Sequence, residues 1–378
     1  MKKFSIATDI ILGKEEGIQL FSGMSRVMVV TDQYMHESGK VSYVTDILQD
    51  CGINYIEFSE VKPDPDIETV GKGAGMIRDF QPQAVVAFGG GSAIDAAKAM
   101  VYFAAKEEED SHSRCRLIAI PTTSGTGSEV TRFAIISDPK KNVKYPLVDD
   151  KLLPDYSILD AELIKSVPPS VTADTGMDVL THAIEAIVSR EANDFTDAAA
   201  EKAVILFRKH LLEAYENPMD SDARRGMHNA SCLAGMAFSN AGLGLNHGMA
   251  HTLGAHFHIP HGRANAILLP YVISFNAGLY DEINESVERY AVIAKLLQVD
   301  SLTSRQSCLN LIRCVKNYTD RLHMPPTIQA AGVKEEDFLN CLDEMVKAAM
   351  VDRCTATNPR TCEDHAIRRL FQIAYYGK

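Results

Sequence analysis

Short, β-branched apolar runs alternate with helix-like stretches through the first part of the chain. Between the runs, residues 38–51 and 68–80 carry apolar side chains at helical spacing. Strands that alternate with helices predict βαβ units around a parallel sheet. The four runs that we predict as strands are Arg26–Asp32, Ile53–Phe58, Ala84–Phe88 and Arg116–Pro121.

The pattern changes after the sequence SVPPS at residues 166–170. From there, long stretches with a 3.6-residue period dominate, for example at 197–215 and 222–238, and few strand runs occur. We therefore predict an α/β plus all-α protein. An α/β, nucleotide-binding domain spans residues 1–166, and an all-helical domain spans residues 167–378.

Composition narrows the class of protein. A chain of 378 residues is long enough for two domains, and its net charge of −12 argues against nucleic acid or an anionic membrane as a partner. Asp9 interrupts the apolar run near the N-terminus, and no later run has membrane-spanning length. We expect a cytoplasmic protein. Its eight cysteines are scattered without a zinc-binding pattern, so any metal should be held by nitrogen and oxygen.

A glycine-rich turn follows the run Ala84–Phe88. Gly89, Gly90, Gly91 and Ser92 lead directly into a helix-like stretch that contains Asp95. Such a turn lets the backbone approach a ligand, and the helix start behind it favours a pyrophosphate. The alternative is a strand-to-helix turn without a ligand, because the full G-x-G-x-x-G spacing is absent.

A hydroxyl-rich loop follows the next run. Such a loop at the carboxyl end of a strand can donate hydrogen bonds to a phosphate or a carboxamide. A polar surface turn is the alternative, but two such loops on successive strands favour a dinucleotide. The hydroxyls within residues 121–131 are those of Thr122, Thr123, Ser124, Thr126 and Ser128.

Asp32 ends the first predicted strand. A carboxylate there can accept hydrogen bonds from the adenosine ribose and would repel a 2′-phosphate, which favours NAD over NADP. The alternative is an aspartate that only caps the following turn.

Two groups of residues suggest a metal site. Asp178 and His182 lie four residues apart on a helical segment and project from one face, which is otherwise apolar. By themselves they could be an ordinary helical ion pair. However, residues 245–262 contain five of the twelve histidines. A site with three histidines and one carboxylate suits Fe(II) or Zn(II).

The five histidines are not equivalent in this pattern. His247 and His251 lie one helical turn apart, whereas Pro260 breaks any helix just before His261. Ligands must converge on one ion from different directions, so one histidine from the helix and one beyond the break is the easier geometry. We predict that His256 and His258 lie on a connecting stretch and face away from the ion.

These motifs together resemble the iron-containing alcohol dehydrogenase family. They are FGGGSAIDAAKA, PTTSGTGSEVT, GMDVLTHAIEA, GLGLNHGMAHTLG, IPHGRANAILLP and TNPRTCED, in this order along the chain. Four further stretches, ISDP, VKYPL, SVPP and DFTDA, are most similar to the 1-propanol dehydrogenases of bacterial propanediol metabolism. The resemblance implies a dehydroquinate synthase-like fold, in which a Rossmann-like, dinucleotide-binding N-terminal domain is joined to a helical, metal-binding C-terminal domain.

The resemblance implies roles for individual residues. It assigns the metal ion to Asp178, His182, His247 and His261, and places His251 beside the substrate and the nicotinamide without binding the ion. We expect His251 to be the catalytic residue that relays the released proton, because an imidazole has a suitable pKa range. The residues expected to bind NAD(H) are Asp32, Gly89, Gly90, Gly91, Ser92, Asp95, Thr122, Thr123, Thr126, Ser128 and Lys144.

The implied reaction is the reversible transfer of hydride between a short-chain primary alcohol, such as 1-propanol, and NAD. A divalent ion, Fe(II) before Zn(II), would acidify the alcohol hydroxyl. The alternatives are a zinc-dependent polyol dehydrogenase of the same fold and a metal- or nucleotide-binding protein without turnover. The resemblance also implies a homodimer, and leaves both the cytoplasm and the lumen of a bacterial microcompartment open as locations.

Overall fold

The chain forms two compact units in the computed structural model, which describes residues 4–106, 115–140 and 143–377. One unit comprises Ser5–Ile164. The other comprises the chain from Lys165 onward together with Phe4, whose ring stacks on Phe195 with the two centroids 5.6 Å apart.

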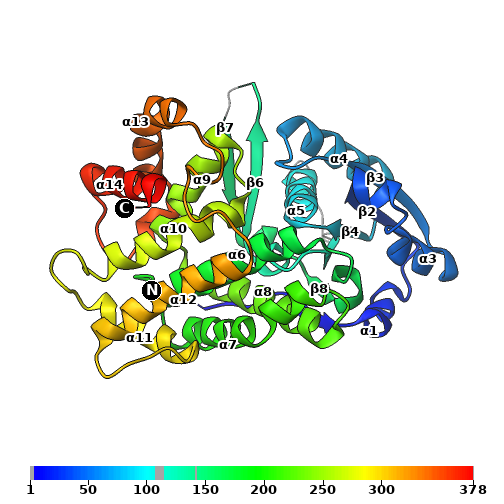
Figure 1. The fold of residues 1–378 in the computed structure, drawn as a ribbon. Coiled ribbons are helices and arrows are strands. Elements are labelled where there is room, and N and C mark those ends of the chain that lie inside the picture. Colours follow the sequence, from blue (N-terminus) through cyan, green and yellow to red (C-terminus); the bar gives the residue numbers. More distant parts are fainter. Residues whose placement is uncertain (1–3, 107–114, 141–142, 378) are drawn as a thin grey trace. The chain divides into compact units, whose positions relative to one another are not determined.

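A six-stranded parallel sheet is the centre of the first unit (Figure 1). Its strand order is β1-β8-β5-β4-β2-β3. The four predicted strands correspond to β2, β3, β4 and β5, whereas β1 and β8 were not predicted. The bounds are β1 Asp9–Leu12, β2 Arg26–Asp32, β3 Asn54–Val61, β4 Ala84–Gly89, β5 Arg116–Pro121 and β8 Tyr156–Leu159.

Both faces of this sheet are buried. Successive residues of a strand point to opposite faces, so Val27 and Val86 pack with α3 on one side, and Met28 and Val85 pack with α4 and α5 on the other. Because both faces are buried, nearly every residue of these strands is apolar, and the strands form continuous apolar runs in the sequence. The helices of this unit are α1 Lys14–Ile18, α2 Gln33–Glu37, α3 Ser42–Asp50, α4 Ile67–Phe80 and α5 Gly91–Lys106.

An antiparallel pair of strands, which the sequence pattern did not predict, also belongs to this unit. In it β6 (Phe133–Asp138) pairs with β7 (Val143–Val148).

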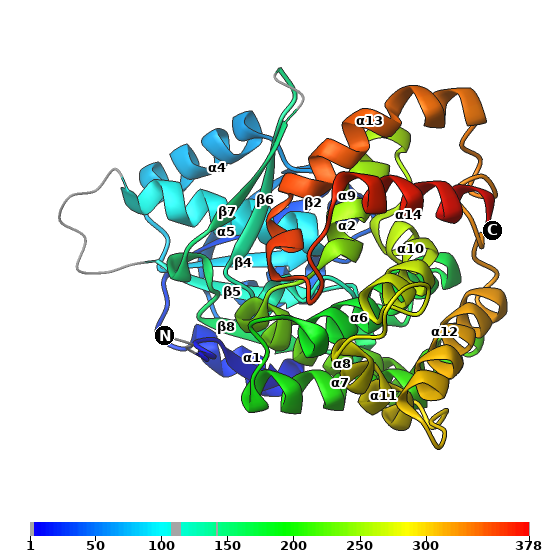
Figure 2. The ribbon, with the colours of Figure 1, turned by 90° about the vertical axis from the view of Figure 1, so that its left-hand side faces the viewer.

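The second unit contains helices and no strand among its described residues (Figure 2). Helix α6 packs against α7, α8 and α10, and α9 packs against α10 and α13. The α/β plus all-α fold class is thus confirmed. The helices are α6 Pro169–Val188, α7 Asp194–Glu216, α8 Ser221–Ala241, α9 Leu245–Phe257, α10 His261–Asn276, α11 Ser286–Leu296, α12 Ser304–Arg321, α13 Glu335–Val351 and α14 Asp364–Tyr376.

Helix α6 is the central helix of this unit. Every residue from Gly176 to Val188 is buried, as expected for a helix that is surrounded by others. Three of these buried residues are nevertheless ionisable: Asp178, His182 and Glu185. Burying an ionisable group costs free energy of folding unless the group is paired or binds a metal, so these three residues indicate a functional site on α6.

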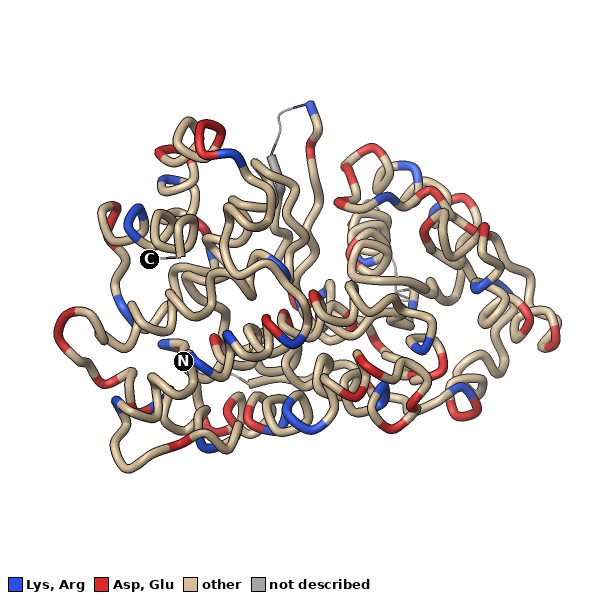
Figure 3. Tube along the Cα trace, viewed as in Figure 1, with Lys and Arg blue, Asp and Glu red and all other residues tan. Residues whose placement is uncertain are grey.

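The positions of Lys and Arg and those of Asp and Glu are interspersed along the described chain (Figure 3). None of the described helices combines the length and the apolar character that a membrane crossing requires.

Candidate metal and cofactor site

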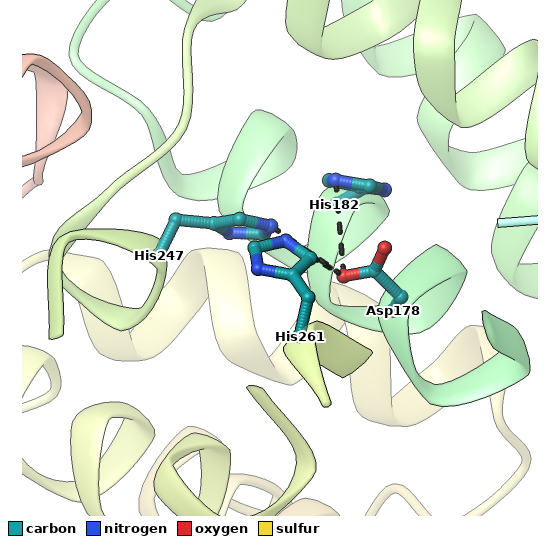
Figure 4. A group of neighbouring side chains, drawn as sticks. All are labelled: Asp178, His182, His247 and His261. Carbon is teal, nitrogen blue, oxygen red and sulfur yellow. Dashed lines mark ion pairs between the residues drawn. The ribbon is translucent and has the colours of Figure 1, made fainter. Parts of the chain in front are cut away.

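Four side chains from three helices converge on one point in the helical unit (Figure 4). We call Asp178, His182, His247 and His261 the four-residue cluster. One ligand atom from each residue lies within 4.8 Å of the ligand atoms of the other three. The sequence prediction had placed these residues in two distant segments, and the fold brings them together.

Helix α6 supplies the first two members of the cluster. Asp178 and His182 are both almost fully buried, and Asp178 Oδ1 lies 3.9 Å from His182 Nε2. The four-residue spacing places both side chains on one face, as the sequence pattern predicted.

A break between α9 and α10 positions the other two members. Helix α9 carries His247 and ends at Phe257, and its C-cap residue His258 has a left-handed φ of 54°. Pro260 then caps the helix that begins at His261. The chain thereby reverses, and His261 reaches the same point as His247. The Nε2 atoms of His247 and His261 lie 3.6 Å and 3.5 Å from Asp178 Oδ1.

A glycine lets the two helices approach closely. A Cβ atom on Gly262 would lie 1.9 Å from the carbonyl oxygen of Asp174 in α6. Any larger residue at position 262 would therefore push His261 away from Asp178.

The cluster has the dimensions of a metal site. Ligand atoms at the corners of a tetrahedron with bonds of about 2.1 Å are roughly 3.4 Å apart, close to the three distances measured from Asp178 Oδ1. Three imidazole nitrogens and one carboxylate oxygen suit Fe(II) or Zn(II). The residues present thus fit such an ion.

Electrostatics keep the cluster's carboxylate ionised. Burial alone would raise the pKa of Asp178, but His182, His261 and His247 together hold this pKa well below its usual value. Burial lowers the pKa of His247, but Glu185 and Asp178 outweigh this effect and raise the pKa to about 9, so an ion must displace a proton from His247 in order to bind. An anionic Asp178 is the form that a metal ion requires.

His251 lies beside the cluster. Its ring stacks on that of His261, with centroids 5.4 Å apart, and its Nδ1 lies 2.9 Å from Asp352 Oδ2. The side chain is 39% exposed, so its other nitrogen is accessible to a substrate or to water. Asp352, which fixes the orientation of this imidazole, was missed by the sequence analysis because it is 101 residues away.

His251, Asp352 and Cys354 also form a compact group of ligand-type atoms. Burial, and then the charge of Asp352, raise the pKa of the Cys354 thiol well above its usual value. A protonated thiol is a poor metal ligand, so we assign no ion to this group.

The structure corrects the placement of His256. This residue lies in the last turn of α9, not on a connecting stretch, because the helix continues to Phe257. His258 is the C-cap residue of that helix and is exposed. Neither residue belongs to a group of candidate ligands among the described residues.

Two further residues border the cluster. Asn265 lies one turn after His261, and its Nδ2 is 2.7 Å from Asp178 Oδ1 and 3.1 Å from His247 Nε2. Glu185 lies seven residues after Asp178, on the same face of α6, and contacts His247. Their helical spacing from the predicted ligands was the signal that could have identified them.

The glycine-rich turn and the hydroxyl-rich loop lie against each other in the α/β unit. The Thr122 amide donates to the Gly89 carbonyl oxygen at 3.0 Å, and a Cβ atom on Gly91 would lie 2.8 Å from Thr126 Cγ2. Gly89 has a φ of 155°, which favours glycine. Gly91 and Ser92 begin α5, and Gly90 precedes it. The backbone amides of this first helical turn have no acceptor within the helix and are available to a ligand at the glycine-rich turn.

Thr122 has a feature that is expected at a ligand site. Its hydroxyl is buried and has no hydrogen-bond partner among the described residues. A side-chain hydroxyl of this kind suits a bound polar group. Thr123 lies next to it, 3.5 Å from the position that a Cβ atom on Gly90 would take.

Asp95 and Ser128 form an internal network that supports the hydroxyl-rich loop. Ser128 Oγ donates to Asp95 Oδ1 at 2.5 Å, and the fully buried Lys98 donates to Ser128 Oγ at 2.9 Å and to the carbonyl oxygen of Phe133 at 2.8 Å. Burial lowers the pKa of Lys98 to about 8. These contacts hold the loop in place.

Asp32 caps a helix. Its Oδ1 accepts a hydrogen bond from the Met35 amide at 2.9 Å, at the start of α2. Its Oδ2 lies 3.3 Å from the position that a Cβ atom on Gly89 would take. The carboxylate therefore caps α2 through Oδ1, and its Oδ2 faces the glycine-rich turn.

Lys144 lies in β7, opposite Ser137. Its side chain is outside the described part of the structure.

Comparison with known proteins gives consistent results along the chain. Residues 8–161 match the family model "Iron-containing alcohol dehydrogenase", and residues 172–375 match "Fe-containing alcohol dehydrogenase family, C-terminal". The NADPH-dependent butanol dehydrogenase of Clostridium saccharobutylicum is 42% identical, over 100% of this chain and 99% of that protein. The 1-propanol dehydrogenase PduQ of Salmonella typhimurium is 50% identical, over 83% of this chain and 84% of that protein.

A solved structure agrees with these relatives. The iron-containing alcohol dehydrogenase of Thermococcus thioreducens superposes with a TM-score of 0.90 at 33% identity, with both chains covered completely.

Proposed function

Because the chain belongs to the iron-containing alcohol dehydrogenase family, we propose that its four-residue cluster holds the divalent ion, with Fe(II) as the native metal and Zn(II) as the alternative. Membership makes the chain an enzyme that interconverts alcohols and aldehydes. The observation that carries the proposal is the convergence of three imidazoles and one carboxylate at metal-site distances.

We propose short-chain primary alcohols, such as 1-propanol, and the corresponding aldehydes as substrates. The similarity to a 1-propanol dehydrogenase and to a butanol dehydrogenase supports this range. An ion in the cluster would supply a Lewis acid to the substrate oxygen. His251, oriented by Asp352, would accept the released proton in alcohol oxidation and return it in aldehyde reduction.

We propose that the α/β unit binds NAD(H). The amides around Gly90, Gly91 and Ser92 would bind the pyrophosphate, and the Thr122 hydroxyl would donate to the cofactor. We also propose a cytoplasmic homodimer. The similarity to a 1-propanol dehydrogenase of the Pdu type supports microcompartment association as a further proposal.

The test of function is a substrate panel on anaerobically purified protein with metal analysis. We expect about one divalent ion per subunit and NADH oxidation with propionaldehyde and butyraldehyde that exceeds the rate with dihydroxyacetone. A clear preference for dihydroxyacetone, or for glycerol in the reverse direction, would favour a polyol dehydrogenase instead. Bound metal and NADH without turnover would contradict the proposed substrates.

Asp32 is expected to select NAD over NADP, because its carboxylate would repel a 2′-phosphate on the ribose. We predict that Asp32→Gly raises kcat/KM with NADPH by roughly tenfold or more, the equivalent of about 1.4 kcal/mol. The measurement is kcat/KM for NADH and NADPH with propionaldehyde.

This experiment needs a matched control, because Asp32→Gly also removes the cap of α2. Asp32→Asn keeps an oxygen for the Met35 amide but removes the charge. It should shift the NADPH to NADH ratio in the same direction as Asp32→Gly without destabilising α2. A wild-type enzyme that uses both cofactors equally well would contradict this role of Asp32.

A further inference from the structure

Glu185 is a buried carboxylate that directly contacts the four-residue cluster from behind. It follows Asp178 and His182 on the same face of α6, and its exposed fraction is 3%. Its Oε2 lies 2.5 Å from His247 Nδ1, and its Oε1 accepts a hydrogen bond from the Asn246 amide at 2.7 Å. Both carboxylate oxygens are thus directed at the start of α9.

The contact determines which nitrogen of His247 is available to an ion. A carboxylate only accepts hydrogen bonds, so Nδ1 must carry the proton in this pair. A neutral imidazole then has its lone pair on Nε2, the atom that lies 3.6 Å from Asp178 Oδ1. Asn265 Nδ2, a donor, lies 3.1 Å from the same Nε2, which agrees with this tautomer.

The backbone that precedes His247 lies very close to Glu185. A Cβ atom on Gly244 would lie 2.7 Å from Glu185 Oε1 and 3.0 Å from Asn358 Oδ1. Asn358 in turn accepts a hydrogen bond from the Leu245 amide at 3.1 Å. The Asn246 amide therefore holds the start of α9 against Glu185, the Leu245 amide holds it against Asn358, and Gly244 leaves room for this close approach.

The charges favour a role toward a cation. With the imidazoles neutral, as metal binding requires, Asp178 and Glu185 contribute a charge of about −2 at the cluster. A divalent ion would balance this charge. An ordinary helical ion pair would not require two carboxylates of one helix to face the same histidine.

We infer that Glu185 is a positioning residue that holds His247 in the tautomer and orientation needed to bind the metal, and that it thereby sets the affinity of the site. This inference rests on the proposed function of the cluster. A carboxylate behind a ligand histidine fixes the ring and increases its basicity, and the loss of such a partner typically weakens metal binding by roughly ten- to a hundredfold.

The test is an equilibrium competition for Zn(II) between the protein and a chelator. In Glu185→Gln, the amide NH2 must face either His247 Nδ1–H or the Asn246 N–H, so one contact is lost. We expect Zn(II) affinity to fall by roughly ten- to a hundredfold. The d–d absorption of the Co(II)-substituted protein should also change, because it reports the geometry of the ligands.

A matched control and a second variant complete the experiment. Glu129 is another buried glutamate, and it belongs to no group of candidate ligands among the described residues, so Glu129→Gln should leave Zn(II) affinity unchanged. Glu185→Asp keeps the charge with a shorter side chain. It should bind Zn(II) with intermediate affinity, and it provides the test if the glutamine variant does not fold.

The outcomes separate the inference from the proposed function. If the wild type binds Zn(II) and both Glu185 variants bind it equally well with unchanged Co(II) spectra, the inference is wrong and the metal site stands. If the wild type itself binds neither ion at the four-residue cluster, the proposed function fails together with the inference.

Discussion

The variants His261→Ala and Asp178→Ala are expected to be nearly free of metal and inactive, whereas His256→Ala and His258→Ala should resemble the wild type. Removing a member of a four-ligand site leaves three protein ligands and an additional open position, so affinity should fall severely. His256 lies in the last turn of α9 and His258 at its end, outside the four-residue cluster. The measurement is metal per subunit after dialysis, together with NADH-dependent reduction of propionaldehyde.

The two neighbouring histidines are the internal control for this experiment. They share the segment and the residue type with His261 but not its position. If His256→Ala emptied the site while His261→Ala retained its metal, the assignment of ligands would be wrong. A modest loss of metal affinity in His258→Ala would still agree with this assignment of ligands, because His258 lies in the break between α9 and α10 that positions His261.

The variant His251→Ala is expected to keep its metal and lose most of its activity. General acid–base catalysis by a positioned side chain contributes roughly 10²- to 10⁴-fold to a rate, so kcat for alcohol oxidation should fall within that range. Metal per subunit should be unchanged, because the ring stacks on His261 without belonging to the four-residue cluster. The measurement is kcat for 1-propanol oxidation alongside metal content.

Asp352 offers a graded comparison for His251. Because its carboxylate orients the imidazole through a 2.9 Å contact, Asp352→Asn should lower kcat less than His251→Ala does. Loss of metal in His251→Ala would mean that this histidine is a ligand. An unchanged kcat in that variant would exclude it as the proton relay.

The elements with strong local patterns were predictable from the sequence. The strands β2 and β5 have the predicted bounds, because buried parallel strands are continuous apolar runs. β1 was missed because it is only four residues long and partly exposed at the edge of the sheet. The antiparallel pair β6 and β7 was missed because its pairing depends on the partner strand more than on local preference.

The features of the site were likewise predictable only where they depend on residues close together in the sequence. The sequence by itself determined that Asp178 and His182 share a helical face, and that glycines and hydroxyls follow two successive strands, because both facts depend only on residues a few positions apart. Tertiary structure decided which histidines meet Asp178, since His247 and His261 reach it only when α9 and α10 pack against α6. It also decided that Glu185 contacts His247, 62 residues away, because spacing along α6 places Glu185 on the face of Asp178 but only helix packing sets which histidine lies opposite it.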